Sequence, residues 1–242
     1  MAHEKKQNLI GHLTELRRCL IRSLISLAIG MGISLYFSKD IFRILQKPLL
    51  EVLPQNSAFI ATGPIEALLT YLQVALLSGL FLSLPLILYQ AWLFVAPALY
   101  VKEKKMALAF VSFASLFFVG GALFGYFLIF PVGFKFFVAT LKDTGIQFLP
   151  QMQDYLSFIS RMLLIFGVVF EMPLIIIGLA KAGLIQLHSL NKAQRYVLVL
   201  IFLVAGILTP GPDVLSQFLL AIPLLMLYEF SVVAVWLMEK KK

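Results

Sequence analysis

The chain has 242 residues, of which 61% are hydrophobic and only 13% charged, and its formal net charge at pH 7 is +8. Soluble globular proteins carry about 45–50% apolar and about 25% charged residues, so this composition excludes an ordinary soluble enzyme, a disordered chain and a disulfide scaffold. It indicates one polytopic membrane domain over residues 1–242. The single Cys19 cannot form an internal disulfide.

The N-terminal residues predict an amphipathic helix over about residues 8–19. Leu9, Leu13 and Leu16 recur at helical spacing with polar side chains off their stripe, which is typical of a helix at the membrane interface. This helix leads into the first of six expected spans, each marked by a long apolar run. The six spans are expected at about residues 20–37, 67–97, 106–134, 158–180, 195–208 and 214–236.

The first connection and the second span are marked by their prolines. Residues 38–66 are expected to form a long loop that contains Pro48. Residues 67–101 carry no charge, so we expect one long, tilted helix that bends near Pro85 and ends near Pro97.

The third and fourth spans each contain a feature that bears on helix packing. Gly120, Gly121 and Gly125 in the third span allow close helix contact. The fourth span is interrupted by Glu171, and Pro173 two residues later is expected to bend it.

The last two spans predict a short helical pair. The fifth has only 13 apolar residues, from Tyr196 to Leu208, or about 20 Å of helix. A tight turn ending at Asp213 joins it to the sixth span. We therefore expect an all-α bundle with a concave face and with Asp213 and Gln217 drawn into a locally thinned membrane. The alternative is that Gln194 and Arg195 snorkel and a partner covers the gap.

The distribution of basic residues predicts the orientation. The 20 Lys and Arg residues divide into 14 on the side of the termini and 6 on the other. An excess of Lys and Arg in short loops marks the cytoplasmic side, so both termini are expected there. The positive charge then reflects topology, and nucleic-acid binding is not expected.

No catalytic constellation, metal site or cofactor motif is present in the sequence. We therefore expect neither an enzyme nor a resident metal or cofactor. The acidic residues are the remaining candidates for chemistry.

Two acids lie in basic segments expected at the cytoplasmic face. Glu15 could pair locally with Arg18, and Glu103 could merely offset its lysine neighbours, as exposed pairs often do. The other interpretation is that the two carboxylates receive an external cation. The residue pattern leaves both interpretations open.

Two further acids lie within the spans. An ionised group at the bilayer centre is costly, so Glu171 is a functional candidate, although it could be a protonated acid that supports the Pro173 bend. Glu229 is either an interfacial acid or a second intramembrane group. Together with Asp213 and Gln217, these residues are candidates for partner contact or transport.

Several segments, in order along the chain, resemble the TatC family of multispanning receptors of the twin-arginine protein translocase. The matching segments are His12 to Arg18, Gln90 to Tyr100 with Glu103 to Lys105, Phe166 to Pro173, Thr209 to Asp213, and Tyr228 with Glu229. The resemblance runs from about residue 8 to residue 230. Departures include Gln73 and Cys19, where basic residues are common, and Gly211, which looks like an insertion.

The resemblance implies a function in protein export. It implies that twin-arginine signal peptides of folded cargo bind at Glu15 and Glu103, with Leu16, Arg17 and Lys104 beside them. It also implies TatA-like and TatB-like single-span partners, oligomers in the export complex, contact with membrane lipid, use of the proton motive force and an inner-membrane location. The planar guanidinium group of arginine can form two parallel hydrogen bonds with a carboxylate, which agrees with this role for the two glutamates.

Two other function classes stay open at this point. A proton-coupled secondary transporter would use Glu171 and Glu229, although such proteins often contain inverted repeats that this chain does not show. A structural or insertase-like scaffold would not depend on paired arginines. Crosslinking to twin-arginine and twin-lysine signal peptides separates the three classes.

Overall fold

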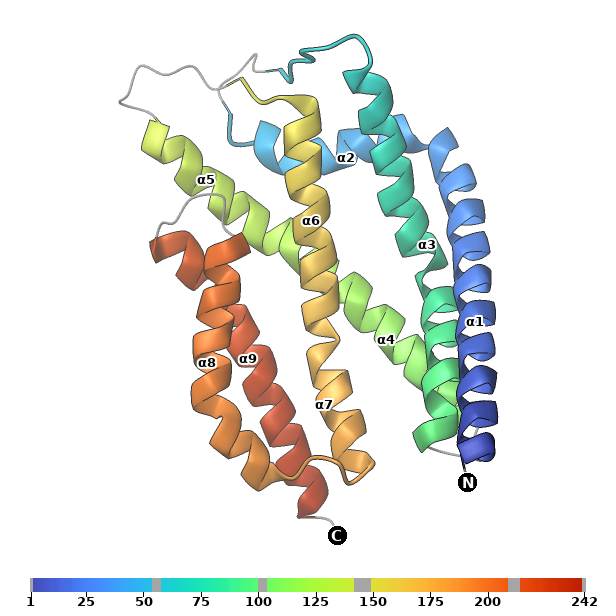
Figure 1. Ribbon diagram of the computed structural model, residues 1–242. Helices are drawn as coiled ribbons and strands as arrows, with labels where there is room; N and C mark the ends of the chain where they lie inside the picture. Colours follow the sequence, from blue (N-terminus) through green and yellow to red (C-terminus); the bar gives the residue numbers. More distant parts are fainter. Residues whose placement is uncertain (1, 54–57, 100–103, 142–148, 209–213, 241–242) are drawn as a thin grey trace. The chain divides into compact units, whose positions relative to one another are not determined.

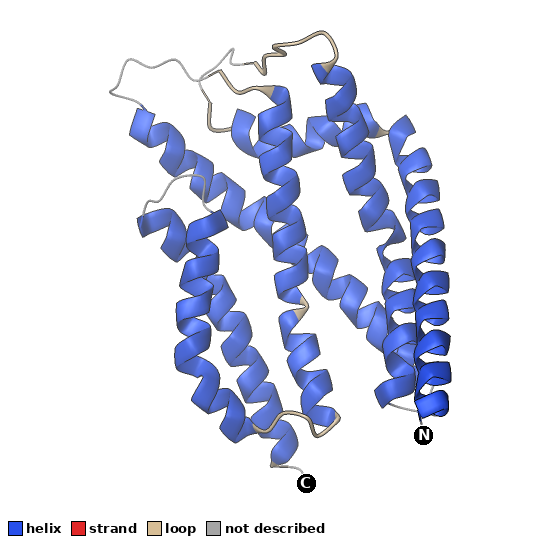
Figure 2. Ribbon diagram, in the orientation of Figure 1, coloured by secondary structure: helices blue, strands red, loops and turns tan. Residues whose placement is uncertain are grey.

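The structure is a computed structural model that describes residues 2–53, 58–99, 104–141, 149–208 and 214–240. Its described residues form helices and no strand apart from one isolated bridge between Ile60 and Gln151, as Figure 2 shows. The elements in Figure 1 are α1 (Ala2–Tyr36), α2 (Ser38–Leu50), α3 (Glu66–Leu99), α4 (Lys104–Phe124), η1 (Gly125–Ile129), α5 (Phe130–Leu141), α6 (Met152–Phe170), α7 (Met172–Lys181), α8 (Leu187–Leu208) and α9 (Val214–Glu239). The all-helical prediction is thus confirmed.

The chain divides into two compact units, residues 1–45 with 61–116 and residues 46–60 with 117–242. In the first unit α1 packs along α3. A Cβ atom added at Gly30 would lie 2.6 Å from the Gly79 carbonyl oxygen, and one at Gly79 would lie 2.6 Å from the Met31 nitrogen. These two glycines therefore let the backbones of α1 and α3 approach closely.

One expectation for the first fifty residues is wrong, that of a loop directly after the first span. The expected interfacial helix and first span form one continuous helix, α1, because neither Gly nor Pro stands between residues 12 and 29 to interrupt it. The expected loop at residues 38–66 begins with the helix α2, which has Pro48 in its last turn. Phe42, Leu45 and Leu49 recur at helical spacing in α2 and are buried.

The long span expected at residues 67–97 corresponds to α3, which continues through Pro85 and ends two residues beyond Pro97. Its first turn is capped by Glu66, whose buried carboxylate accepts hydrogen bonds from the Thr62 backbone and hydroxyl and from the Gly63 N–H. These hydrogen bonds tie the segment before α3 to the first residue of the helix.

In the second unit, the glycines expected to permit close contact do so at two of three positions. A Cβ at Gly121 would overlap the Phe166 carbonyl oxygen, and one at Gly125 would lie 2.6 Å from the Phe166 ring. Gly120 has nothing within 4 Å, so the prediction is wrong there. Gly125 also begins η1, a single π-helical turn between α4 and α5.

The pair α8 and α9 packs together, and α9 also packs on α7. Their shared core contains Ile176, Leu190, Tyr228 and Val235. With 22 and 26 residues, α8 and α9 are shorter than α1 and α3, which have 35 and 34. The helix α8 begins at Leu187, eight residues before the expected start at 195, because polar residues continue the helix beyond the apolar run.

Five helical stretches are long and apolar enough to cross a membrane: His12–Tyr36, Glu66–Phe94, Leu108–Thr140, Met152–Lys181 and Leu220–Glu239. They correspond to five of the six expected spans. The remaining one, in α8, carries Lys192 and Arg195 before its apolar part. The count of six spans stays a prediction.

Candidate functional site

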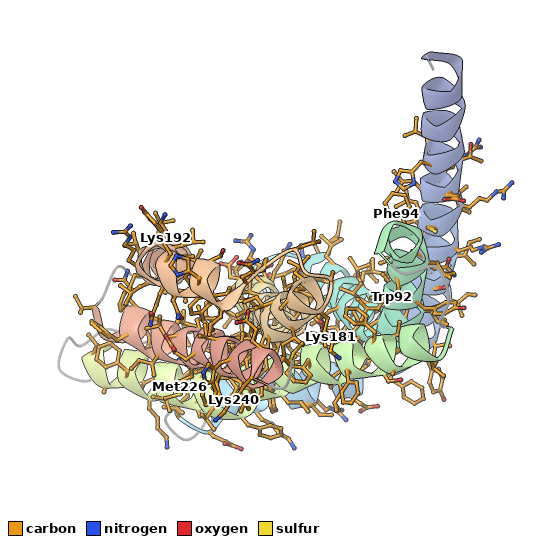
Figure 3. The ribbon with its side chains drawn as sticks, turned by 90° about the horizontal axis from the view of Figure 1, so that it is seen from below. Trp92, Phe94, Lys181, Lys192, Met226 and Lys240 are labelled. Carbon is orange, nitrogen blue, oxygen red and sulfur yellow. The ribbon has the colours of Figure 1, made fainter. Side chains whose placement is uncertain are left out.

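The N-terminal turns of α1 and the C-terminal turns of α3 meet through an aromatic contact. The rings of His12 and Phe94 stack with centroids 4.3 Å apart and planes at 21°. Trp92 packs on Phe110 of α4 with centroids 4.3 Å apart. Figure 3 shows Trp92 and Phe94 at this end of α3. We call this set, with Glu15, the α1–α3 junction.

Glu15 lies one helical turn from the stacked histidine. Its Oε2 atom is 4.0 Å from His12 Nδ1, and its side chain is 60% exposed. Within the described residues it forms no ion pair with Arg18, so the local pairing considered for it does not occur. The carboxylate is therefore open to an external cation.

The other residues expected beside Glu15 are placed only in part. Leu16 is 43% exposed, and Arg17 is exposed on the same helix. Glu103 lies outside the described residues. Lys104 begins α4, five residues after the end of α3, and its side chain is also outside the description.

The chemistry of the α1–α3 junction suits an amphipathic cationic ligand. An exposed carboxylate binds a guanidinium weakly by itself, about 1 kcal/mol or less, so selective binding needs additional contacts. Leu13, Leu16 and Leu20 supply an exposed apolar stripe next to Glu15, at 62%, 43% and 58% exposure. A cationic side chain next to an apolar segment would satisfy both features.

Glu171 lies at the interruption between α6 and α7. Pro173 has no N–H to donate to the Val169 carbonyl, and the Glu171 N–H turns to the carbonyls of Val168 and Val169 instead. The Glu171 side chain is half-buried, and within the described part of the chain its Oε1 atom is buried without a hydrogen-bond partner. Whether the side chain faces a concave surface stays a prediction.

Glu229 and Gln217 serve in the pairing of α8 with α9. Gln194 Nε2 donates a hydrogen bond of 2.6 Å to Glu229 Oε1, and Gln217 Nε2 donates one of 2.7 Å to the Phe202 carbonyl. The Tyr228 hydroxyl donates to the Leu190 carbonyl at 2.8 Å. Asp213, the other polar candidate here, lies outside the described residues.

Two contacts escaped prediction from the sequence, the His12–Phe94 stack and the Gln194–Glu229 bond. Each joins residues at least 35 positions apart in the chain, and neither Phe94 nor Gln194 stands out from its neighbours by residue type. The only available signal was that His12 and Glu15 both lie off the leucine stripe of α1. Among the residues that the structure describes, no three His, Cys, Asp or Glu side chains gather as metal ligands.

The apolar helices and the absence of strands in the described chain define a multi-pass helical membrane protein. The family model of the Sec-independent protein translocase protein (TatC) matches residues 11–223. The chain therefore belongs to the TatC family.

Similar proteins extend over almost the whole chain. The TatC protein of Desulforapulum autotrophicum is 43% identical over 99% of this chain and 88% of its own length. That of Escherichia coli K12 is 40% identical over 96% and 89%, and that of Aquifex aeolicus is 39% identical over 97% of each chain. A crystal structure of the twin arginine translocase receptor TatC in DDM matches with a TM-score of 0.83 and 38% identity, over 92% of this chain and 98% of the other.

This membership establishes the general role. The chain is a membrane component of the Sec-independent protein translocase, which works in protein transport. Translocation implies protein cargo and other translocase subunits as partners.

Proposed function

We propose that the chain is the receptor that binds twin-arginine signal peptides of folded cargo at the cytoplasmic face. The observation that carries this proposal is the exposed Glu15 carboxylate, held one turn from the His12–Phe94 stack. The stack ties Glu15 to the last turns of α3, and the segment that follows α3 contains Glu103. Two carboxylates then serve two guanidinium groups.

The neighbouring residues have distinct parts in this proposal. Leu16 contacts the apolar segment of the signal peptide, because it is exposed on the same helix as Glu15. Arg17 and Lys104 contact the headgroups of anionic lipid at the same membrane surface.

The proposed assembly follows from the same role. Six spans with both termini in the cytoplasm place the α1–α3 junction on the side from which cargo arrives. The chain lies in the inner membrane, forms oligomers in the complex and recruits TatA-like and TatB-like subunits, with transport driven by the proton motive force. Glu171, Asp213, Gln217 and Glu229 contribute polar groups toward these partners or the cargo. The family assignment favours this role over the proton-coupled transporter.

The direct test measures binding of a fluorescent twin-arginine signal peptide to the full chain in nanodiscs. Loss of a charge-assisted hydrogen bond costs about 1–3 kcal/mol, so Glu15→Gln and Glu103→Gln should each raise Kd by about 5- to 150-fold. A twin-lysine peptide should bind the wild-type chain more weakly than the twin-arginine peptide, because lysine lacks the bidentate fork.

The matched control is Glu51→Gln, the same change at an exposed acid in the second unit, which should leave Kd unchanged. Equal affinity of the wild-type chain and both carboxylate variants would refute the proposed site.

A further inference from the structure

The first half of α8 carries an exposed basic hollow that the proposed signal-binding role does not use. A hollow of about 490 Å³ is lined by Asn191, Lys192, Gln194, Arg195 and Leu198. We call this set the α8 hollow. It offers two cations one turn apart, two neutral amides and one apolar side chain, all from a single helix.

The two cations of the α8 hollow outnumber the one acid beside it, Glu229, so its net charge is positive. Neither Lys192 nor Arg195 forms an ion pair among the described residues. The acid that reaches toward the hollow, Glu229, has its Oε1 atom engaged by Gln194 Nε2 at 2.6 Å. The remaining acid on this side, Glu239, accepts the Leu187 N–H at 2.8 Å. The α8 hollow therefore favours an anion.

The position of the α8 hollow along the helix indicates where that anion sits. Arg195 lies over the ring of Tyr196, with its Cζ atom 5.0 Å from the centroid, and Lys240 lies over the ring of Trp236 at 5.2 Å. Exposed Tyr and Trp side chains beside cations are typical of the membrane–water interface. Figure 3 shows Lys192 on α8 and Lys240 on α9 at this end of the pair.

The face that bears the α8 hollow changes from charged to apolar within two turns. Asn191, Arg195, Leu198 and Phe202 follow the i, i+4, i+7, i+11 spacing of one helix face. Leu198 is 45% exposed, and the neighbouring Val199 is 63% exposed. The distance from Asn191 to Leu198 along the helix is about 10 Å at about 1.5 Å per residue.

We propose that the α8 hollow binds one anionic phospholipid of the surrounding membrane. Lys192 and Arg195 bind the headgroup phosphate, and the second N–H of the Gln194 amide with the Asn191 amide bind its polar oxygens. One acyl chain lies along Leu198 and Val199. An acidic segment of a partner protein fits less well, because it would not use the apolar part of the same face.

The experiment titrates the purified full chain, in a neutral detergent, with phosphatidylglycerol and counts bound lipid by native mass spectrometry. Phosphatidylglycerol should bind more tightly than phosphatidylcholine, which has the same phosphate but no net charge. Replacing both cations, in Lys192→Gln with Arg195→Gln, should weaken phosphatidylglycerol binding roughly 30-fold, since each nearby cation contributes about 5-fold. The pair Lys192→Arg with Arg195→Lys keeps both charges and should retain most of the affinity.

The matched control removes two exposed cations from α2, in Lys39→Gln with Arg43→Gln, and should leave binding unchanged. Leu198→Gln should weaken phosphatidylglycerol but not soluble glycerol phosphate, because only the lipid has an acyl chain. If the double glutamine variant fails to fold, the single variants Lys192→Gln and Arg195→Gln replace it, each with a roughly 5-fold loss expected.

Three results would overturn the proposal. Unchanged phosphatidylglycerol binding in the charge-removed variant would show that lipid binds elsewhere. Glycerol phosphate that binds as tightly as phosphatidylglycerol would make the α8 hollow a site for free anions. An acidic peptide that displaces phosphatidylglycerol at equal concentration would assign the α8 hollow to a protein partner.

Discussion

The His12–Phe94 stack restricts the part of α1 that carries Glu15. A stacked aromatic pair contributes about 0.5–1.5 kcal/mol beyond the burial of its area. This contact joins the beginning of α1 to the end of α3, so it holds the turn that carries Glu15 against the last turns of α3. The His12–Phe94 stack thus orients the turn that carries Glu15, and a bound ligand does not have to contact the stack.

We predict that Phe94→Ala weakens signal-peptide binding by about 2- to 12-fold, which corresponds to the loss of the stack. The measurement is the Kd of the twin-arginine peptide in nanodiscs. Leu93→Ala is the control, because Leu93 is the adjacent residue, is 40% exposed and takes no part in the stack. Equal losses in the two variants would assign the effect to the helix end in general.

We predict that Glu171→Leu makes the protein more stable but lowers its activity in export. Glu171→Leu removes a buried oxygen that has no hydrogen-bond partner in the described chain. Its removal should raise the free energy of unfolding by about 1–3 kcal/mol. Export of twin-arginine cargo should nevertheless fall, because an ionisable group is costly to place within a span and usually marks a functional position. Thermal unfolding and an export assay measure the two effects.

The conservative change Val168→Leu, at an exposed position one turn earlier in α6, serves as the control for Glu171→Leu. Full export by Glu171→Leu would contradict a functional role for this acid.

Among the elements, α1 and α3 depend on a backbone contact that tolerates no side chain. Gly30 and Gly79 meet so closely that a Cβ on either would lie 2.6 Å from a backbone atom of the other helix, and backbone atoms cannot rotate away. Dispersion and close packing, rather than burial from water, hold helices together within a bilayer. This contact therefore determines how the two helices cross.

We predict that Gly30→Ala lowers the free energy of unfolding by about 1–3 kcal/mol through overpacking. Gly32→Ala, two residues along the same helix, should be neutral or stabilising by up to about 1 kcal/mol, because nothing lies within 4 Å of its added Cβ and alanine favours helix. Denaturation in mild detergent measures both. Equal stability of the two variants would show that α1 and α3 can move apart enough to accommodate a methyl group at Gly30 without cost.

The elements also show what a sequence can and cannot predict. Five of the six apolar runs lie in helices long and apolar enough to cross a membrane, because the hydrophobic requirement extends over some 20 residues. The interfacial segment and the first span belong to one helix, α1, and α8 extends before its apolar run, because polar residues continue a helix where no stop signal stands. The helix α2 was missed because its short apolar stripe lies among charges and contains Pro48 within its span.

The candidate site was predictable from the sequence only with the help of the family resemblance. The pattern around Glu15 left its role open between a local pair and a ligand site, and the resemblance to a family decided the interpretation. The exposure of Glu15 and its position beside His12 come from the structure. The aromatic stack could not be predicted, because it joins residues 82 positions apart that have no sequence signature.

At the scale of the whole molecule, the helix pair α8 and α9 differs from the rest of the chain. The apolar part of α8 has 13 residues, or about 20 Å, whereas a hydrocarbon core is about 30 Å thick. Gln217 bonds to the Phe202 carbonyl and so couples the start of α9 to the same short segment. Mismatch of this size is met by local thinning of the bilayer, by snorkelling of flanking residues or by oligomerisation, and we expect thinning here.

We predict that a spin label at Val214→Cys, in a chain with Cys19→Ser, lies deeper in the membrane than a label at Leu35→Cys near the end of α1. The expected difference approaches about 10 Å, the shortfall of the apolar run. Power-saturation measurements of label depth in nanodiscs provide the test. Labels at equal depth would show that the pair reaches the normal interface and that no thinning occurs.

The π-helical turn η1 has a consequence for the helical stretch that contains it. A π turn holds one more residue than an α turn, so every residue after Ile129 is rotated by about 100° from where an uninterrupted α-helix would place it. Gly125 is buried, and so are Ile129 and Phe130, four and five positions further on. Deleting one residue within η1 would remove this offset and turn the whole of α5 about its own axis. The one additional residue in η1 therefore determines which face of α5 packs against the rest of its unit.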